Sequence, residues 1–166
     1  MLATFDATAR GNAGDHATDA NPGCPVDIVP FEPWHLEYLT ETTAQAWLGK
    51  DYLYGRNLQR AGPCYTAFAG EHVIACAGVF MVWDGRAQAW SMLSTDVTRY
   101  VKTVFRETKR FLDGYLCRRI ECTVDPRSEQ AKNWARHLGF NFNGLMPAYT
   151  PGGDDMELWA MVRPWL

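Results

Sequence analysis

The cysteine and histidine side chains are the groups with which this chain could carry out nucleophilic or metal chemistry. The five cysteines include no Cys-x-x-Cys pair, and the four histidines are equally unpaired in sequence. No nearby histidine completes a nucleophile triad with Cys117 or Cys122, so covalent catalysis has no support. An odd count of unpaired cysteines is typical of reduced thiols that fill a core. The sequence therefore predicts neither a metal site nor a disulfide framework.

Residues 124–140 have the pattern of a strand end, a capped helix and a glycine stop. Asp125 is placed to cap the helix, with a proline at the first helical position, and Ser128 offers a second capping hydroxyl. Gly139 supplies the left-handed residue that ends the helix, and Phe140 folds back against it. Helical spacing then predicts one apolar stripe that faces a sheet. The stripe consists of Ala131, Trp134, Ala135 and Leu138.

This segment resembles the C-terminal signature of the Gcn5-related N-acetyltransferases (GNAT), in which Val-x-x-x-Asn-x-x-Ala leads into a helix ending Leu-Gly-Phe. The matching residues are Val124, Ala131, Leu138, Gly139 and Phe140. Ser128 stands at the family's asparagine and can also accept a hydrogen bond at a helix start. The family's frequent catalytic tyrosine falls at Ala135, which has no proton to donate. The resemblance implies a GNAT fold and, in the family, transfer of an acetyl group from acetyl-CoA.

The rest of the chain predicts the element order of that fold. The expected strands are Val26–Phe31, Cys64–Ala69, Val73–Trp83, Ala87–Leu93, Ile120–Val124, Asn141–Tyr149 and Met156–Val162. The expected helices cover about residues 33–47, 96–116 and 126–138, and residues 49–63 are either a short helix or a loop. Asp84-Gly85 is a strong hairpin signal, and Asp96 can cap the long helix, whose apolar face Thr108 interrupts.

We therefore expect an α/β (α+β) protein with a GNAT-like mixed, mostly antiparallel central sheet and helices on both faces. The strand from residue 73 to residue 83 is apolar on both sides, as a sheet covered on both faces requires. We expect the helices at residues 96–116 and 126–138 to lie on opposite faces. The fourth and fifth strands should run parallel and splay apart.

The resemblance places the cofactor loop between the fourth strand and the long helix, at residues 92–100. In the family this loop is rich in glycine, so that backbone N–H groups approach the pyrophosphate of acetyl-CoA. Here it contains no glycine, and Asp96 brings a negative charge to the helix start. We expect a degenerate site, with acetyl-CoA as cofactor only if the chain is an enzyme. The candidate cofactor-binding residues are Leu93, Ser94, Thr95, Arg99, Lys102 and Ser128.

A GNAT enzyme also needs a base for the attacking amine and an acid for the leaving thiolate. Glu121, at the start of the fifth strand, is the best candidate base. It could equally be a solvated strand residue paired with Arg119. Tyr149, expected on the sixth strand, replaces the missing tyrosine if the last hairpin bends inward.

The composition of the chain argues against two classes of binding partner, nucleic acids and membranes. The 166 residues have the length of one domain, and the net charge of -3 with scattered basic residues argues against nucleic acid. The longest apolar run is too short for a bilayer and no secretory signal is visible, which predicts a soluble intracellular protein without a membrane partner. Residues 1–24 carry too little apolar surface to order alone, so we expect an arm before a GNAT-like domain at residues 25–166.

A narrower resemblance is to the GNAT-like proteins of tailed bacteriophages, some of which are grouped with internal virion proteins. It implies a virion or assembly role, located in the virion or host cytoplasm, with other virion proteins bound through the arm and a homo-oligomer allowed. The alternatives are an N-acetyltransferase with an atypical cofactor loop and a small modulator of a host protein. The matching positions are Ala89, Trp90, Leu93, Thr95, Val124, Asp125, Trp134, Leu138, Gly139 and Phe140.

Overall fold

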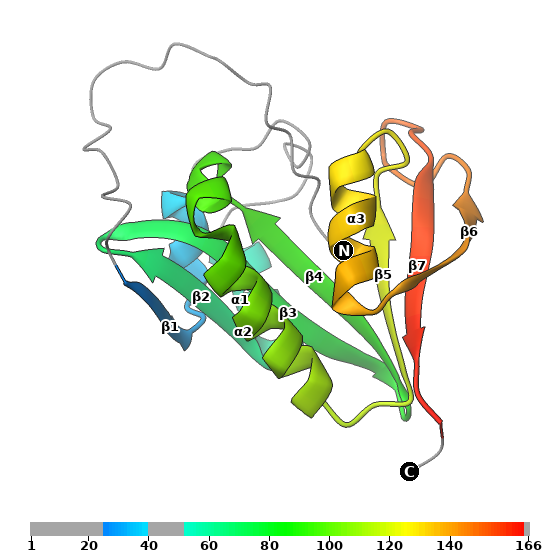
Figure 1. The fold of residues 1–166 in the computed structure, drawn as a ribbon, viewed down its shortest axis with the longest axis horizontal. Coiled ribbons are helices and arrows are strands. Elements are labelled where there is room, and N and C mark those ends of the chain that lie inside the picture. The colour runs from blue at the N-terminus through cyan, green and yellow to red at the C-terminus, as the bar shows by residue number, and fades with distance from the viewer. Residues whose placement is uncertain (1–24, 40–51, 165–166) are drawn as a thin grey trace.

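The computed structural model describes residues 25–39 and 52–164, so the predicted arm at residues 1–24 lies outside the described residues. They form one seven-stranded sheet with the order β1-β2-β3-β4-β5-β7-β6 (Figure 1). All neighbouring strands pair antiparallel except β4 and β5, which confirms the predicted mixed sheet. The strands are β1 (Val26–Pro30), β2 (Cys64–Ala69), β3 (His72–Trp83), β4 (Arg86–Leu93), β5 (Arg119–Val124), β6 (Asn141–Met146) and β7 (Met156–Val162).

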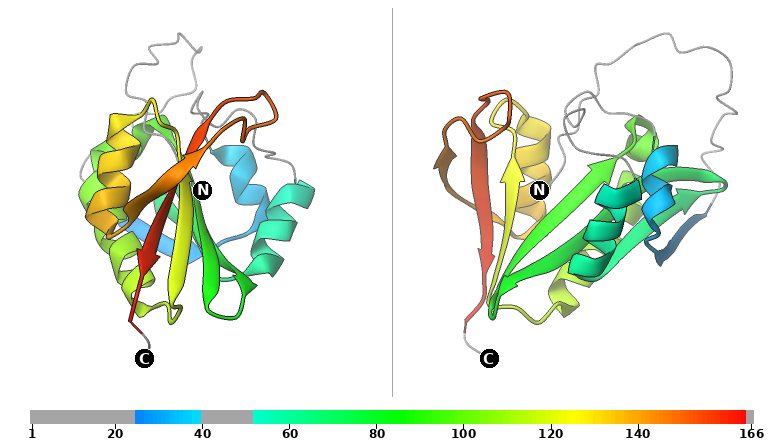
Figure 2. Two further views of the ribbon diagram at one scale, coloured as in Figure 1. Left: turned by 90° about the vertical axis from the view of Figure 1, so that its right-hand side faces the viewer. Right: turned by 180° about the vertical axis from the view of Figure 1, so that it is seen from behind.

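Helices cover both faces of this sheet, as predicted. The helical elements are η1 (Pro33–Tyr38), α1 (Tyr52–Ala61), η3 (Thr95–Tyr100), α2 (Val101–Gly114) and α3 (Glu129–Leu138). The left-hand view of Figure 2 shows α2 and α3 on one side of the strands and η1 and α1 on the other. None of the described helices is long and apolar enough to cross a membrane.

The prediction that the long helix and the last helix lie on opposite faces is wrong. Both contribute to the same apolar cluster, in which Phe105 of α2 packs edge-on against Trp134 of α3. The reason is topological. Strand β6 runs parallel to β5, because each is antiparallel to β7. The connections through α2 and α3 therefore advance in the same direction across the sheet, and right-handed crossovers then place both helices on one face.

Strands β4 and β5 run parallel and then separate, as predicted. They pair only from Arg86 opposite Arg119 to Gln88 opposite Glu121. Beyond Gln88, β4 continues to pair with β3, whereas β5 pairs with β7 up to Val124. The carboxyl halves of the two strands therefore diverge, which all views of the ribbon show (Figures 1 and 2). We call this divergence, between residues 89–93 of β4 and 122–124 of β5, the splay.

The start of α3 differs from the prediction. Ser128 caps the helix, since its Oγ accepts a hydrogen bond from the N–H of Ala131 at 3.1 Å. Asp125 lies too early in the chain to cap it. Its carboxylate instead accepts the backbone N–H of Arg127 at 2.8 Å and binds the guanidinium of the same residue. The helix consequently begins at Glu129, after a turn that holds the proline.

The end of α3 follows the prediction closely. Gly139 has φ = 105°, and its N–H donates to Arg136 O at 3.0 Å. The N–H of Phe140 donates to Ala135 O at 3.0 Å, and the Phe140 ring is fully buried. These are the paired hydrogen bonds of a left-handed helix stop. The predicted apolar stripe is buried against the sheet, and it consists of Ala131, Trp134, Ala135 and Leu138.

The long helix has a different start from the predicted one. A 3-10 turn at Thr95–Tyr100 precedes α2, which begins at Val101. Ser94 and not Asp96 is the cap of this turn, because the Ser94 Oγ accepts the N–H of Asp96 at 3.1 Å. A serine just before the turn reaches the backbone two residues later, so its hydroxyl satisfies the N–H of Asp96 itself, and the helical segment begins before the predicted cap.

The structure also shows how far the first predicted helix, the segment at residues 49–63 and the sixth strand follow the sequence-based expectations. The first predicted helix is a 3-10 turn at Pro33–Tyr38, and the rest of it lies outside the described residues. Within residues 49–63 the structure has the helix α1, whose Gly55 approaches η1 so closely that a Cβ would lie 2.8 Å from Pro33 O. The sixth strand ends at Met146, because a turn follows in which Tyr149 N and Thr150 N both donate to Asp154 O.

Candidate functional site

The splay opens next to a groove between the start of α2 and the length of α3. The groove has a volume of about 310 Å³. Lys102, one of the predicted cofactor residues, is exposed and lines it. Trp134 forms an apolar wall, against which Phe105 packs with ring centroids 5.4 Å apart. The full lining is Val101, Lys102 and Phe105 of α2, with Gln130, Asn133, Trp134 and His137 of α3.

The other predicted cofactor residues are engaged in the structure of the chain itself or lie outside the groove. Ser94 and Ser128 use their hydroxyls as helix caps. Leu93 is buried and lines a different cavity under α2. Thr95 accepts the Thr98 hydroxyl at its carbonyl oxygen at 3.5 Å. The last of them, Arg99, is exposed on η3 and is absent from the groove lining.

The segment that should cradle a pyrophosphate lacks the usual features of such a cradle. Residues 94–100 contain no glycine, and the Ser94 cap and a tight 3-10 turn order them. Asp96 lies half-buried in the first turn of this segment, five positions before the start of α2. A negative charge near a helix start disfavours a bound anion. The residues present therefore do not fit a pyrophosphate in the manner of the GNAT family.

The candidate base Glu121 is clamped by two arginines. Its side chain is buried, and its Oε2 accepts from Arg86 Nε at 3.0 Å and from Arg86 Nη2 at 2.5 Å. Oε1 accepts from Arg119 Nε at 2.5 Å. Burial alone would raise the pKa of Glu121, but the hydrogen bonds from Arg86 and Arg119 lower it below the ordinary value. The structure thus has the Arg119 pairing that the sequence allowed, but the carboxylate is buried and not solvated, and Arg86 of β4 is a second partner.

The candidate acid Tyr149 lies outside the sheet. It belongs to the turn between β6 and β7 and is 45% exposed, with its N–H bound to Asp154 O at 2.9 Å. The neighbouring Ala148 has φ = 49°, a left-handed conformation that turns the chain away from the strand direction. The expectation that Tyr149 stands on the sixth strand is therefore wrong.

Thr123 is a feature of the splay that the sequence did not point out. It lies on β5 beyond the last residue paired with β4, and it is 2% exposed. Its Oγ1 is the one buried side-chain oxygen or nitrogen without a hydrogen-bond partner among the described residues. A buried hydroxyl without a partner costs free energy, so a group bound in the splay that can hydrogen-bond to it would stabilise the site. An amide or thioester carbonyl of a pantetheine chain has that chemistry.

Sequence reasoning missed Thr123 and Arg86 for different reasons. Arg86 is 35 residues from Glu121, and only the parallel pairing of β4 with β5 brings them together. A signal for Thr123 existed, since it is a polar residue in the otherwise apolar end of a predicted strand. Metal chemistry has no candidate in residues 25–39 and 52–164, where no three His, Cys, Asp or Glu side chains are grouped to hold an ion.

Comparisons with known proteins agree with this geometry at the level of fold. The sequence matches no protein-family model and no curated protein. The structure is similar to the Ard1 protein of Thermoplasma volcanium, with 12% identity over 84% of this chain and 99% of that chain, at a TM-score of 0.69.

Two acetyltransferases are similar to this chain at slightly lower TM-scores. With an IAA acetyltransferase from Bacillus cereus the identity is 15%, over 84% of this chain and 100% of that chain, at a TM-score of 0.62. With a chimera that contains a spermidine N-acetyltransferase of Vibrio cholerae, the identity is 14%, over 82% of this chain and 95% of that chain, at a TM-score of 0.63. The chain has the fold of the GNAT acetyltransferases.

Proposed function

We propose that this chain is a GNAT-fold protein with a degenerate acetyl-CoA site that acts as a virion or assembly-associated protein of a tailed phage. The main observation in support of a lost catalytic activity is that Arg86 and Arg119 bind the carboxylate of Glu121. A general base works best when its pKa lies near the operating pH. The two arginines lower the pKa of Glu121 and occupy both carboxylate oxygens, so this residue is a poor proton acceptor.

The loop before α2 supports the same proposal. In place of glycines that would let the backbone approach phosphate oxygens, it has the Ser94 cap and the charge of Asp96. We infer that the chain retains the diverging strands of the GNAT fold but has lost the side chains that a GNAT enzyme uses to hold the cofactor and transfer protons. A fold retained without its chemistry suits a protein whose role is to bind other proteins.

The assembly role rests on the resemblance to phage GNAT-like proteins and on the composition of residues 1–24. That segment has few large apolar side chains, and we propose that contacts with another chain would order it. We propose other virion or assembly proteins as its partners, with the protein in the virion or the host cytoplasm. A homo-oligomer is compatible with this role, and neither nucleic acid nor a membrane is required.

Two measurements test the proposal. Acetyl-CoA should leave the melting temperature of the purified protein nearly unchanged, although a ligand at about a hundred times its dissociation constant would add about 2.7 kcal/mol to the stability. Particles purified from an infected culture should contain the chain at fixed copy number, and deletion of residues 1–24 should abolish its incorporation. A large thermal shift with acetyl-CoA, together with particles that lack the chain, would overturn the proposal.

A second candidate function is N-acetyl transfer with an atypical cofactor loop. The splay, the adjacent groove and the unpartnered Thr123 hydroxyl favour it. This candidate predicts micromolar binding of acetyl-CoA and release of free CoA when amines are added. Thr123→Val should then weaken binding while the melting temperature of the unliganded protein stays the same or rises. If the chain is absent from particles and does not bind acetyl-CoA, the remaining candidate is a modulator of a host protein.

A further inference from the structure

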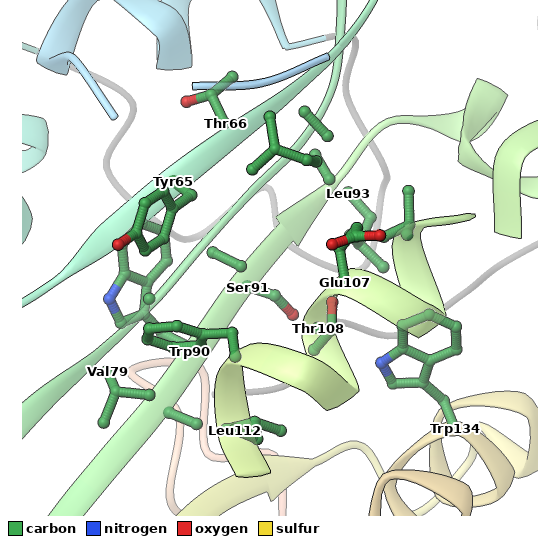
Figure 3. Close-up of a pocket in the computed structure, with 18 residues that line it drawn as sticks. Tyr65, Thr66, Val79, Trp90, Ser91, Leu93, Glu107, Thr108, Leu112 and Trp134 are labelled. Atoms are coloured by element: carbon green, nitrogen blue, oxygen red, sulfur yellow. The ribbon is translucent and has the colours of Figure 1, made fainter. Parts of the chain in front are cut away.

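A cavity lies between α2 and the sheet, apart from the groove at the splay (Figure 3). Its volume is about 90 Å³. One water needs roughly 10–15 Å³, and an engineered apolar cavity of about 150 Å³ binds benzene. The cavity under α2 is therefore several times larger than a water site and approaches the size that holds a small ring.

The cavity exists because small side chains meet across the helix–sheet interface. On the sheet, Ala67 of β2 lies opposite Ala75 of β3, and Ala77 of β3 lies opposite Ser91 of β4. A row of short side chains therefore crosses these three strands. On the helix, Thr108 interrupts the apolar face four residues from larger side chains on either side. Neither layer fills the space between them. The small residues that line it are Ala67, Ala75, Ala77, Gly78, Ala89, Ser91 and Thr108.

The lining is almost wholly apolar, which defines what the cavity can hold. Glu107 is the one charged residue in the described lining, and its carboxylate already accepts from Arg106 Nε at 2.9 Å and lies 3.9 Å from Arg110. It is therefore satisfied by cations of its own helix. Ser91 of β4 and Thr108 of α2 each contribute a hydroxyl to the lining (Figure 3). A charged ligand would lose its hydration there without gaining a partner.

The cavity also has a route of entry. An open groove at the end near β1 and β2 shares Ile28, Tyr65 and Phe111 with the cavity lining. At the opposite end stands Trp134, which also lines the groove beside the splay. A molecule can thus enter from the β1 side without passing the groove between α2 and α3, and it would lie against Trp134, which also lines that groove.

We propose that this cavity binds a compact, uncharged apolar molecule about the size of a six-membered ring, with at most one hydroxyl. Empty apolar cavities destabilise a native state, so an occupant of this kind stabilises the fold by filling it. Its position under α2 and against Trp134 couples binding to the helix that forms one wall of the groove. The proposal does not depend on acetyl-CoA, because the cavity opens near β1 and its lining includes residues of β4 at the splay but none of β5.

The test uses benzene, phenol and benzoate as probes with the full-length protein. Benzene and phenol should raise the melting temperature saturably, and at about ten times its dissociation constant a probe raises the folding equilibrium constant about tenfold. Benzoate should bind at least about tenfold more weakly, since its charge must be desolvated. The indole N–H resonance of Trp134 should shift with benzene and phenol.

Three variants make the site assignment specific. Ala77→Leu fills the cavity from the sheet and Thr108→Leu fills it from the helix, and each should abolish the response to benzene. Ala61→Leu makes the same change as the first variant at an exposed position at the end of α1, and it should leave the response intact. If Ala77→Leu fails to fold, the response of Thr108→Leu to benzene tests whether the cavity is the binding site. No saturable response in the natural sequence, an equal response to benzoate, or an unchanged response in the filled variants would overturn the proposal.

Discussion

The guanidinium of Arg86 on β4 donates two hydrogen bonds to one oxygen of Glu121 on β5, at 3.0 Å from Nε and 2.5 Å from Nη2. Glu121 stands in the last residue pair that joins the two strands before they separate. The other carboxylate oxygen accepts from Arg119, so the ion cluster fastens the closed end of the splay. In this chain the candidate base thus stabilises the fold that forms the splay.

This arrangement predicts that Glu121→Gln lowers the free energy of unfolding. Hydrogen bonds to charged groups contribute about 1.5–3 kcal/mol, and the neutral amide would leave two arginines without their counter-charge. Denaturant unfolding near neutral pH should show a loss of that size. Glu71→Gln in the exposed β2–β3 turn is the matched control, and it should have almost no effect.

The same variant has a defined pH dependence. Because the pKa of Glu121 is lowered in the folded state, its contribution is fully present above the ordinary carboxyl value of 4.5 and is lost as the pH falls through the folded value. The stability difference between the natural protein and Glu121→Gln should therefore be constant at neutral pH and shrink in acid. A difference that grew as the pH fell would contradict the clamp.

Trp134→Ala should destabilise the domain, because this side chain of α3 belongs to the core cluster and packs against Phe105 of α2. Large aromatic truncations cost about 3–5 kcal/mol. We expect a value toward the lower end, since the Trp134 side chain already borders a cavity. Trp83→Ala at the exposed tip of the β3–β4 hairpin is the comparison, with a small effect expected. Equal losses in the two variants would show that α3 does not anchor the core.

Gly139→Ala should destabilise by about 1–2 kcal/mol, since an L residue pays this penalty in the left-handed conformation. Gly139 has φ = 105°, and an added Cβ would lie 3.4 Å from the Met161 methyl group. Gly114→Ala provides the opposite case. No atom lies within 4 Å of a Cβ there, and the residue is the last of α2. That change should be neutral or stabilise by about 0.4–1 kcal/mol. Both effects are read from melting curves.

The features that the sequence predicted well depend on neighbours within a few residues. The stop at Gly139 and the hairpin at Asp84-Gly85 are of this kind, and Gly85 has the positive φ of 83° that the turn requires. Capping was only partly predicted. Ser128, expected as a second capping hydroxyl, is the cap of α3, whereas Asp125 accepts the N–H of Arg127 ahead of the helix. Ser94 and not Asp96 caps the turn before α2.

What the sequence could not predict depends on pairings across the sheet. The face on which α3 lies follows from the handedness of two consecutive crossovers, which no local pattern encodes. The second partner of Glu121 comes from a strand 35 residues earlier. The cavity under α2 needs three strands in register beneath Thr108, so it too appears only in the assembled fold.

The loop before α2 gives the last prediction, on residual affinity for acetyl-CoA. Removal of the charge in Asp96→Asn should strengthen binding about two- to fivefold, because one charge near a helix start contributes about 0.3–1 kcal/mol. Lys102→Glu should weaken it by at least as much, since Lys102 lines the groove. Asp113→Asn, near the far end of α2, is the control and should change nothing. Dissociation constants from NMR titration decide, and equal values in all three variants would show that the ligand does not bind in this groove.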